Sequence, residues 1–339
     1  MQELVQISKY AGMREDLIQA GGGNSSMKLN DQEMLIKASG YQMADIHEGS
    51  GYSKVDYAML NRFFAETPLA QITLDDEGTL ISQCTLEGKR PSIETFLHSI
   101  TDRITLHTHP MVVNCLATGE MSQLKALFPD ALFVDYATPG IELAKAYFTA
   151  FQKSGKTACP LIFLKNHGMV VSGQTSQEVI AATEKVVCIL EKALQLDLRK
   201  YHVCTEIYNA YPHIGNDIIV LLNHQELKAL LAEGKRFTYD FCPDCVVYGG
   251  KRLLELTDTQ PMTQQIVKHE ERFGAPVVMQ YQGELYVRAS SVKKTKEIES
   301  VLAFAAGVLL SGQAVELLSE ENVNRILNLD SEKYRQTLK

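Results

Sequence analysis

Residues 104–110 read ITLHTHP, and this stretch carries the clearest structural and chemical signal in the sequence. The apolar run before the histidines predicts a short β-strand that ends at Pro110. Side chains two residues apart in a strand point to the same face, so His107 and His109 should project side by side. Two imidazoles at one strand end are candidate metal ligands, and a metal site needs at least one further group.

A third histidine lies in the stretch LIFLKNHGMVVSG, residues 161–173. His167 occupies a predicted tight turn between two apolar strands, from which its side chain can reach a neighbouring strand end. Three imidazoles suit Zn²⁺ and leave a fourth position for water or substrate. Because a single histidine is more often a packed or hydrogen-bonded residue, this interpretation needs support from other residues.

That support comes from the stretch PSIETFLHSI, residues 91–100. It predicts a helix with Ser92 as the N-cap and Glu94 in the first turn. A first-turn carboxylate often only complements the helix dipole, but this helix leads directly into the two histidines. A carboxylate near a metal that polarises a carbonyl group can move a proton on the adjacent carbon. We therefore expect Glu94 to be an acid/base residue.

The composition excludes several classes of partner. The chain has 339 residues, 45% of them hydrophobic, and a formal net charge of −8. This modest acidity argues against nucleic acid or an anionic membrane as the partner, and no apolar run is long enough to cross a bilayer. Seven scattered cysteines and an N-terminus unlike a signal peptide predict a reduced, cytoplasmic protein. The one local pair, Cys242 and Cys245, is weak evidence for a metal or redox site.

The pattern of apolar residues predicts an α/β protein. Helices are expected over residues 4–18, 55–64, 91–100, 141–155 and 176–200, and strand pairs over 27–40, 71–82 and 161–173. After about residue 205 the pattern changes to helices over 221–234 and 293–310, with short strands near 245–250 and within 276–289. We expect a catalytic domain over residues 1–204 and a smaller C-terminal α/β extension over residues 205–339.

A glycine-rich segment, GGGNSS, occupies residues 21–26. It precedes a predicted strand, whereas the dinucleotide fingerprint and the phosphate-binding P-loop both open a helix. Backbone amides of such a turn can bind a phosphate, but glycines can equally just stop the preceding helix. Both interpretations stay open at this point.

The ordered set GGGNSS, KASG, PSIETFLH, HTHP, DYATPG and KNHG, within residues 1–200, resembles the class II aldolase/adducin family. Because the chain also has the PSIET stretch and a C-terminal α/β extension, it resembles a long form of this family. It is most similar to the aldolase part of rhamnulose-1-phosphate aldolase/alcohol dehydrogenase proteins. No dinucleotide fingerprint follows, so we expect the dehydrogenase half to be absent. The resemblance implies a three-layer α/β/α fold with a mixed, largely antiparallel sheet. It also implies a homotetramer with sites between subunits.

The resemblance also implies roles for individual residues. His107, His109 and His167 match the metal ligands, and Glu94 matches the acid/base carboxylate. The positions that match the phosphate cradle are Gly23, Asn24, Ser39, Gly40 and Ser92. Two departures weaken this cradle, because Ile93 stands where a second hydroxyl is usual and Gly22 where a threonine is common. An unphosphorylated sugar or sugar acid therefore stays open, and Tyr136 is a candidate second acid or a structural residue.

Together these features predict a Zn²⁺-dependent aldolase that acts on a small molecule. The expected reaction is retro-aldol cleavage of a ketose, with a ketose 1-phosphate as first choice, to an aldehyde and dihydroxyacetone phosphate or a similar fragment. Three alternatives stay open: a dehydratase, a decarboxylase of a sugar or sugar-acid phosphate, and a non-catalytic adducin-like module.

Overall fold

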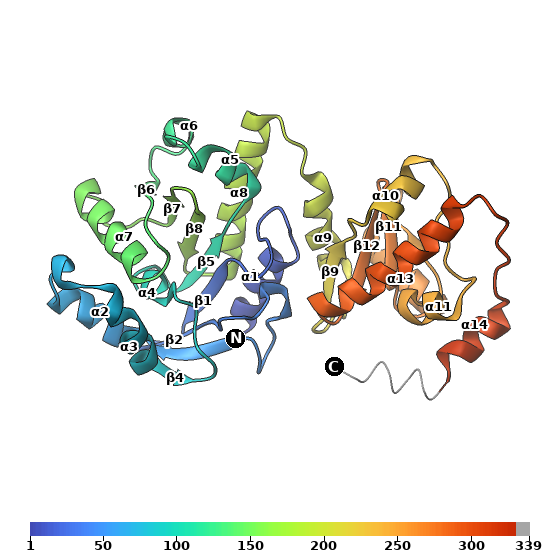
Figure 1. Ribbon diagram of the computed structural model, residues 1–339, viewed down its shortest axis with the longest axis horizontal. Coiled ribbons are helices and arrows are strands. Elements are labelled where there is room, and N and C mark those ends of the chain that lie inside the picture. The colour runs from blue at the N-terminus through green and yellow to red at the C-terminus, as the bar shows by residue number, and fades with distance from the viewer. Residues whose placement is uncertain (330–339) are drawn as a thin grey trace. The chain divides into compact units, whose positions relative to one another are not determined.

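The computed structural model describes residues 1–329 (Figure 1). The chain divides into two compact units, Met1–Leu198 and a second unit that begins at Arg199. The boundary expected after residue 204 falls inside helix α9 (Arg199–Ala210), which belongs to the second unit. The assignment of the first unit as the catalytic domain stays a prediction.

The first unit contains an eight-stranded sheet with the strand order β4-β3-β2-β1-β5-β8-β7-β6. Its strands are β1 (Asn24–Lys28), β2 (Glu33–Lys37), β3 (Tyr52–Asp56), β4 (Thr85–Glu87), β5 (Ile104–Thr108), β6 (Leu132–Val134), β7 (Leu161–Leu164) and β8 (Gly168–Gly173). Neighbouring strands are antiparallel except β6 and β7, which are parallel. The sheet is therefore mixed and largely antiparallel, which confirms the expected fold class.

Helices cover both faces of this sheet (Figure 1). One group comprises α1 (Gln2–Gly12), α5 (Met111–Ala117) and α8 (Ser176–Leu194), and α1 and α8 contact β5. The other group comprises α2 (Tyr57–Glu66), α3 (Leu74–Cys84), α4 (Thr95–Ser99) and α7 (Ile141–Ser154). Short elements connect these layers: α6 (Ser122–Leu127) and the 3₁₀ turns Met43–Asp45 and Leu69–Gln71. Apolar side chains of this second group form two buried clusters with side chains of the sheet.

The strand pair expected over residues 71–82 is wrong, because α3 occupies most of this segment. Thr73 and Asp76 form a capping box, in which the carboxylate of Asp76 accepts a hydrogen bond of 2.8 Å from the N–H of Thr73. One face of the helix buries Leu80, Ile81 and Cys84. Gly78, the glycine that suggested a hairpin turn, instead lies within the helix. A glycine there lowers helix stability by only about 1 kcal/mol relative to alanine.

The helix expected over residues 91–100 is shorter in the structure. Glu94 is the residue before the first helical residue of α4, so Ser92 is not the N-cap. Ser92 still organises this turn, since its carbonyl oxygen accepts from the N–H of Thr95 at 3.1 Å and its hydroxyl accepts from the N–H of Glu94 at 3.3 Å. Similarly, residues 52–56 form β3 before α2 begins, where a helix was expected from Val55.

The second unit contains a four-stranded sheet in the order β10-β11-β12-β9. Its elements, after α9, are β9 (Ile218–Leu221), α10 (Gln225–Ala232), α11 (Pro243–Gly249), β10 (Leu254–Glu255), α12 (Met262–Phe273), β11 (Val278–Tyr281), β12 (Glu284–Ala289), α13 (Val292–Leu310) and α14 (Glu320–Leu327). The hairpin within 276–289 and the helix over 293–310 are confirmed. The strand expected near 245–250 is wrong, because Pro243 occupies the first turn of a helix, where its missing N–H costs nothing. Among the described residues, no helix is both long and apolar enough to cross a membrane.

Candidate metal centre

The candidate site lies at one end of β5, the strand between β1 and β8. His107 is completely buried there and lies opposite Asn24 on β1 and Val170 on β8. His109 follows the strand, and its backbone N–H donates to the carbonyl of Leu17 at 2.9 Å. The sheet and the segment after α1 therefore fix both histidines of the HTH stretch.

His167 reaches this strand end from the turn between β7 and β8. The preceding Asn166 has a positive φ of 55°, a conformation that asparagine adopts more readily than most residues. The side-chain amide of Asn114, on α5, donates to the carbonyl oxygen of His167 at 3.1 Å. The turn that holds the third histidine is thus anchored to a helix of the neighbouring layer.

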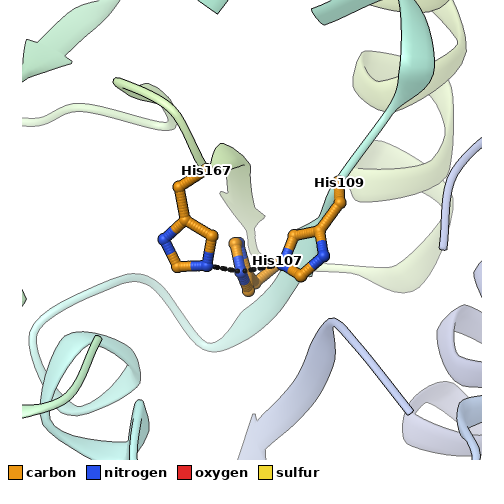
Figure 2. Close-up of side chains that lie close together, drawn as sticks. All are labelled: His107, His109 and His167. Carbon is orange, nitrogen blue, oxygen red and sulfur yellow. Dashed lines mark hydrogen bonds between the residues drawn. The ribbon is translucent and has the colours of Figure 1, made fainter. Parts of the chain in front are cut away.

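Figure 2 shows the three imidazoles converging, with His107 between the other two. Its Nε2 lies 3.0 Å from Nε2 of His109 and 3.3 Å from Nε2 of His167. The ligand atoms of the three residues all lie within 4.8 Å of one another. The structure therefore brings together the three histidines that the sequence predicts.

The donor set fits a divalent cation. The Nδ1–H of His107 donates to the carbonyl oxygen of Met169, with the two atoms 3.0 Å apart, and this tautomer leaves Nε2 as a free lone pair. Tetrahedral bonds of about 2.0–2.1 Å from zinc to nitrogen place neighbouring nitrogens about 3.3 Å apart. The separations of His107 Nε2 from Nε2 of His109 and of His167, 3.0 and 3.3 Å, are close to this value. Among the described residues, no comparable cluster of metal-binding side chains includes Cys242 or Cys245.

The electrostatic environment favours neutral imidazoles, the form that binds metals. Burial, and to a smaller extent the nearby His167, lowers the pKa of His107 to about 3. Burial and the other two imidazoles likewise lower the pKa of His109 to about 3. At neutral pH, protons therefore compete weakly with a metal for these two nitrogens.

Glu94 faces the same point from the start of α4. Its Oε2 lies 3.4 Å from Nε2 of His107, and its Oε1 lies 3.3 Å from Nε2 of His167. The side-chain amide of Asn24 donates to Oε2 at 2.5 Å and to the hydroxyl of Ser92 at 3.2 Å. Asn24 thus orients the carboxylate and joins it to a residue expected to bind phosphate.

Two residues of the glycine-rich segment, Gly22 and Gly23, pack closely against the two histidines of the HTH stretch. A Cβ atom at Gly23, where φ is 63°, would lie 2.8 Å from the carbonyl oxygen of His107. A Cβ atom at Gly22 would lie 2.9 Å from Nδ1 of His109. Side chains at these positions would push the segment away from the strand end.

The remaining expected site residues lie on two further segments. Ser39 and Gly40 follow β2, where the N–H of Ser39 donates to the carbonyl of Arg90 at 2.8 Å and Gly40 has a φ of 83°. Tyr136 is 62% exposed, and no contact among the described residues joins it to the histidines or Glu94. Both roles considered for Tyr136, a second acid and a structural residue, stay predictions.

Sequence reasoning missed Lys37, the last residue of β2. Its side chain is only 4% exposed, and its ammonium donates to the carbonyl of Gly21 at 3.2 Å. The signal lay in the stretch KASG, where a lysine ends an apolar strand directly before two candidate phosphate-binding residues, Ser39 and Gly40.

The buried histidines predict how stability depends on pH in the metal-free protein. Burial lowers the pKa of His98 and of His107 to about 3, and both side chains are fully buried. In the unfolded chain they protonate below about pH 6.5, so their contribution is complete above that pH and is lost as the pH falls toward 3. Urea unfolding between about pH 7 and pH 5 should show the free energy of unfolding falling by up to about 1.4 kcal/mol per pH unit for each histidine. The variant His98→Gln should show a smaller slope, and a stability independent of pH would contradict this expectation.

Comparisons with known proteins identify the family of this chain. The model of the class II aldolase and adducin N-terminal domain matches residues 2–194. The chain is 28% identical over 213 residues to the "Uncharacterized oxidoreductase YuxG" of Bacillus subtilis (strain 168), a match that covers 58% of this chain. This chain spans only 29% of the length of that relative.

Two solved structures illustrate the fold. The N-terminal class II aldolase domain of a conserved protein from Thermoplasma acidophilum aligns with a TM-score of 0.50 and 22% identity, covering 57% of this chain and 92% of that chain. The L-fuculose-1-phosphate aldolase from Thermus thermophilus aligns with a TM-score of 0.37 and 17% identity, covering 57% and 90%. The first similarity supports the fold, and the second is too weak to support any argument. Because the family model covers more than half of the sequence, the chain belongs to the family of class II aldolase and adducin N-terminal domains.

Proposed function

We propose that this protein is a metal-dependent class II aldolase that cleaves a ketose 1-phosphate by a retro-aldol reaction. The products would be an aldehyde and dihydroxyacetone phosphate or a similar fragment. The observation that supports this proposal is the convergence of three imidazole nitrogens and the Glu94 carboxylate. His107 Nε2 lies 3.0–3.4 Å from the other two imidazoles and from Glu94, and Glu94 also lies 3.3 Å from His167. Family membership independently supports an enzyme of this superfamily.

In the proposed site, His107, His109 and His167 hold a divalent cation, and three imidazoles favour Zn²⁺. When bound, such a cation polarises the carbonyl of the substrate and stabilises the negative charge that develops as the carbon–carbon bond breaks. The chain itself fixes the ligand geometry through the Nδ1–H of His107, which donates to the Met169 carbonyl.

Glu94 is the proposed acid/base residue. In the cleavage direction the substrate hydroxyl that becomes the aldehyde loses a proton, and the carboxyl group of Glu94 delivers a proton to the carbon that carries the charge, so that no net proton is gained or lost. In the synthesis direction Glu94 removes that proton from the carbon. The amide of Asn24 holds Oε2, so the group approaches the histidines in one orientation. A carboxylate fixed in this way loses little conformational entropy in the transition state.

The phosphate of the substrate is proposed to bind between the segments that carry Gly23, Asn24, Ser39, Gly40 and Ser92. Hydrogen bonds hold two of these segments together, since Asn24 donates to the hydroxyl of Ser92 at 3.2 Å. The N–H of Ser92 in turn donates to the carbonyl of Lys37, at the end of β2, at 3.1 Å. We further propose a cytoplasmic homotetramer, which light scattering of the purified protein would test.

The decisive experiment combines zinc reconstitution with product analysis. The purified chain would be incubated with a panel of ketose 1-phosphates, and aldehyde and dihydroxyacetone phosphate would be quantified separately. We expect equimolar release of both products only with the metal-loaded protein. Loss of water or release of carbon dioxide without carbon–carbon cleavage would contradict the aldolase and support a dehydratase or a decarboxylase. A protein that binds no metal after reconstitution would instead support an adducin-like module.

A further inference from the structure

Two cysteines meet at the start of helix α11 in the second unit (Figure 1). Cys242 is the N-cap of this helix, and Cys245 is its third helical residue. Side chains at these two positions face each other, as the two partners of a capping box do. A hydrogen bond joins the two thiols. The start of α11 therefore holds two sulfur atoms side by side.

The backbone around this pair is fixed at both ends of the helix. The carbonyl of Cys242 accepts from the N–H of Val246 at 3.2 Å, and Pro243 restricts the backbone of the first helical residue. At the other end, the hydroxyl of Tyr239 donates to the carbonyl of Gly249 at 2.8 Å. The two thiols therefore stay neighbours for as long as the second unit is folded.

The two thiols differ in their access to solvent. Cys245 is completely buried in the apolar core of the second unit, in the same cluster as Phe237 and Tyr239. Cys242 packs against this cluster and is only half-buried. A dissolved reagent can therefore reach Cys242 first, whereas Cys245 can react only with an atom that already lies beside it.

This difference separates two chemical roles. Burial raises the pKa of the Cys245 thiol to about 12, and the adjoining Cys242 adds to this effect. Since the thiolate is the nucleophile, Cys245 stays protonated and inert until a disulfide forms at the neighbouring sulfur. Thiol–disulfide exchange proceeds through a mixed disulfide, which an accessible thiol forms and a second thiol resolves. Cys242 suits the first step and Cys245 the second.

Two other interpretations of the pair fit less well. A structural zinc site needs four ligands, and among the described residues no group of three or more candidate metal ligands includes either cysteine. Core thiols without a joint role need not be neighbours, and the remaining cysteines are indeed scattered along the sequence, at Cys84, Cys115, Cys159, Cys188 and Cys204.

We propose that Cys242 and Cys245 form a thiol–disulfide exchange site for small-molecule disulfides. The thiolate of Cys242 attacks one sulfur of the small disulfide, which forms a mixed disulfide and releases one small thiolate. Cys245 then loses its proton to solvent and attacks Sγ of Cys242, which releases the second small thiolate. The two cysteines lose two electrons and two protons, and the small disulfide becomes two thiols. This site is independent of the proposed aldolase reaction.

The test counts thiols in the full chain that carries Cys115→Ser, because the exposed Cys115 would form a mixed disulfide of its own. The protein is equilibrated without oxygen in mixtures of reduced and oxidised glutathione, quenched with acid, unfolded and alkylated. Trypsin cuts after Arg236 and Lys251, so both cysteines lie in the peptide 237–251. Mass spectrometry of this peptide counts its free thiols and any glutathione bound to it.

We expect the peptide 237–251 to lose both thiols, to retain no glutathione and to regain both thiols when a dithiol reductant is added. Cys245→Ala and Cys245→Ser should each stop at one glutathione on Cys242, because no resolving thiol is present. Cys242→Ser should leave Cys245 reduced, since reagents cannot reach it. The matched control is Cys188→Ser, which removes another half-buried thiol and should leave oxidation of the pair unchanged.

Circular dichroism would establish that each variant folds, and the two replacements of the buried Cys245 guard against one that does not. Three results would overturn the proposal: both thiols free in the most oxidising mixture, glutathione that stays on Cys242 although Cys245 is present, or equal oxidation of Cys245 in Cys242→Ser. None of these results depends on ketose cleavage, so a failed aldolase assay leaves the exchange site in place.

Discussion

The variant His107→Ala should bind less than one metal ion per chain and should lose most of its activity. Removing a residue that only hydrogen-bonds a metal ligand costs up to about 100-fold, and removing the ligand itself should cost more. His107 is the middle ligand of the three, is completely buried and lies within the sheet, so its removal leaves only two imidazoles to hold the cation. Elemental analysis after reconstitution and the retro-aldol assay would measure the two effects. Metal binding and activity should be lost together, because the same three histidines serve both.

A matched control exists in the second unit. His269 is also buried, and its two ring nitrogens lie 3.1 Å from the carbonyl oxygens of Gly274 and Arg252. The variant His269→Gln should therefore retain about as much metal and activity as the wild type. Wild-type metal content in His107→Ala would show that the three histidines are not the metal site.

The variant Glu94→Gln should lower kcat by about 10²- to 10⁴-fold, the usual contribution of a positioned acid/base group. Glutamine keeps the size of the side chain, and its carbonyl oxygen can still accept from the Asn24 amide. Metal content should therefore stay unchanged. Proton transfer can be measured apart from bond cleavage, as the exchange of a carbon-bound hydrogen of dihydroxyacetone phosphate with solvent deuterium by NMR.

The control for Glu94 is Glu178, a carboxylate with a purely structural role. Glu178 completes the capping box of α8, where its carboxylate accepts from the N–H of the N-cap residue Thr175 at 3.3 Å and also from the N–H of Gln174 at 2.8 Å. The variant Glu178→Gln should lower stability slightly and leave deuterium exchange at the wild-type rate. Exchange and cleavage at wild-type rates in Glu94→Gln would exclude the proposed role of Glu94.

The site was largely predictable from sequence because its residues sit at local features that have clear patterns. His107 and His109 end an apolar strand, and His167 lies in an asparagine–histidine–glycine turn between two apolar strands, as the structure confirms. What the sequence cannot supply is the pairing order, which places β8 beside β5 and so brings residues sixty positions apart into contact. The family resemblance implied that the three histidines act together, but it did not give the order of the strands.

The wrong secondary-structure predictions arose where a short stretch carries signals for both a strand and a helix. The segment of α3 contains Asp75 and Gly78, which also favour a hairpin turn, and only the pairing of Thr73 with Asp76 identifies a helix start. In α11, the apolar pair Val246–Val247 favours a strand, although Pro243 marks the start of a helix. Lys37 was missed because a lysine at a strand end is usually exposed, and its burial depends on packing that no local pattern encodes.

The place of β5 in the sheet has a consequence for dynamics. Because β5 is hydrogen-bonded to β1 on one side and β8 on the other, its amide hydrogens should exchange with solvent only when the whole first unit opens. His107 therefore sits on the slowest-exchanging part of this unit, whereas His109 and His167 follow or precede strands. His107 should therefore move away from a bound metal only when the whole first unit unfolds, whereas His109 and His167 can move when their local turns open. Slow release of the metal can then occur while the sheet stays intact.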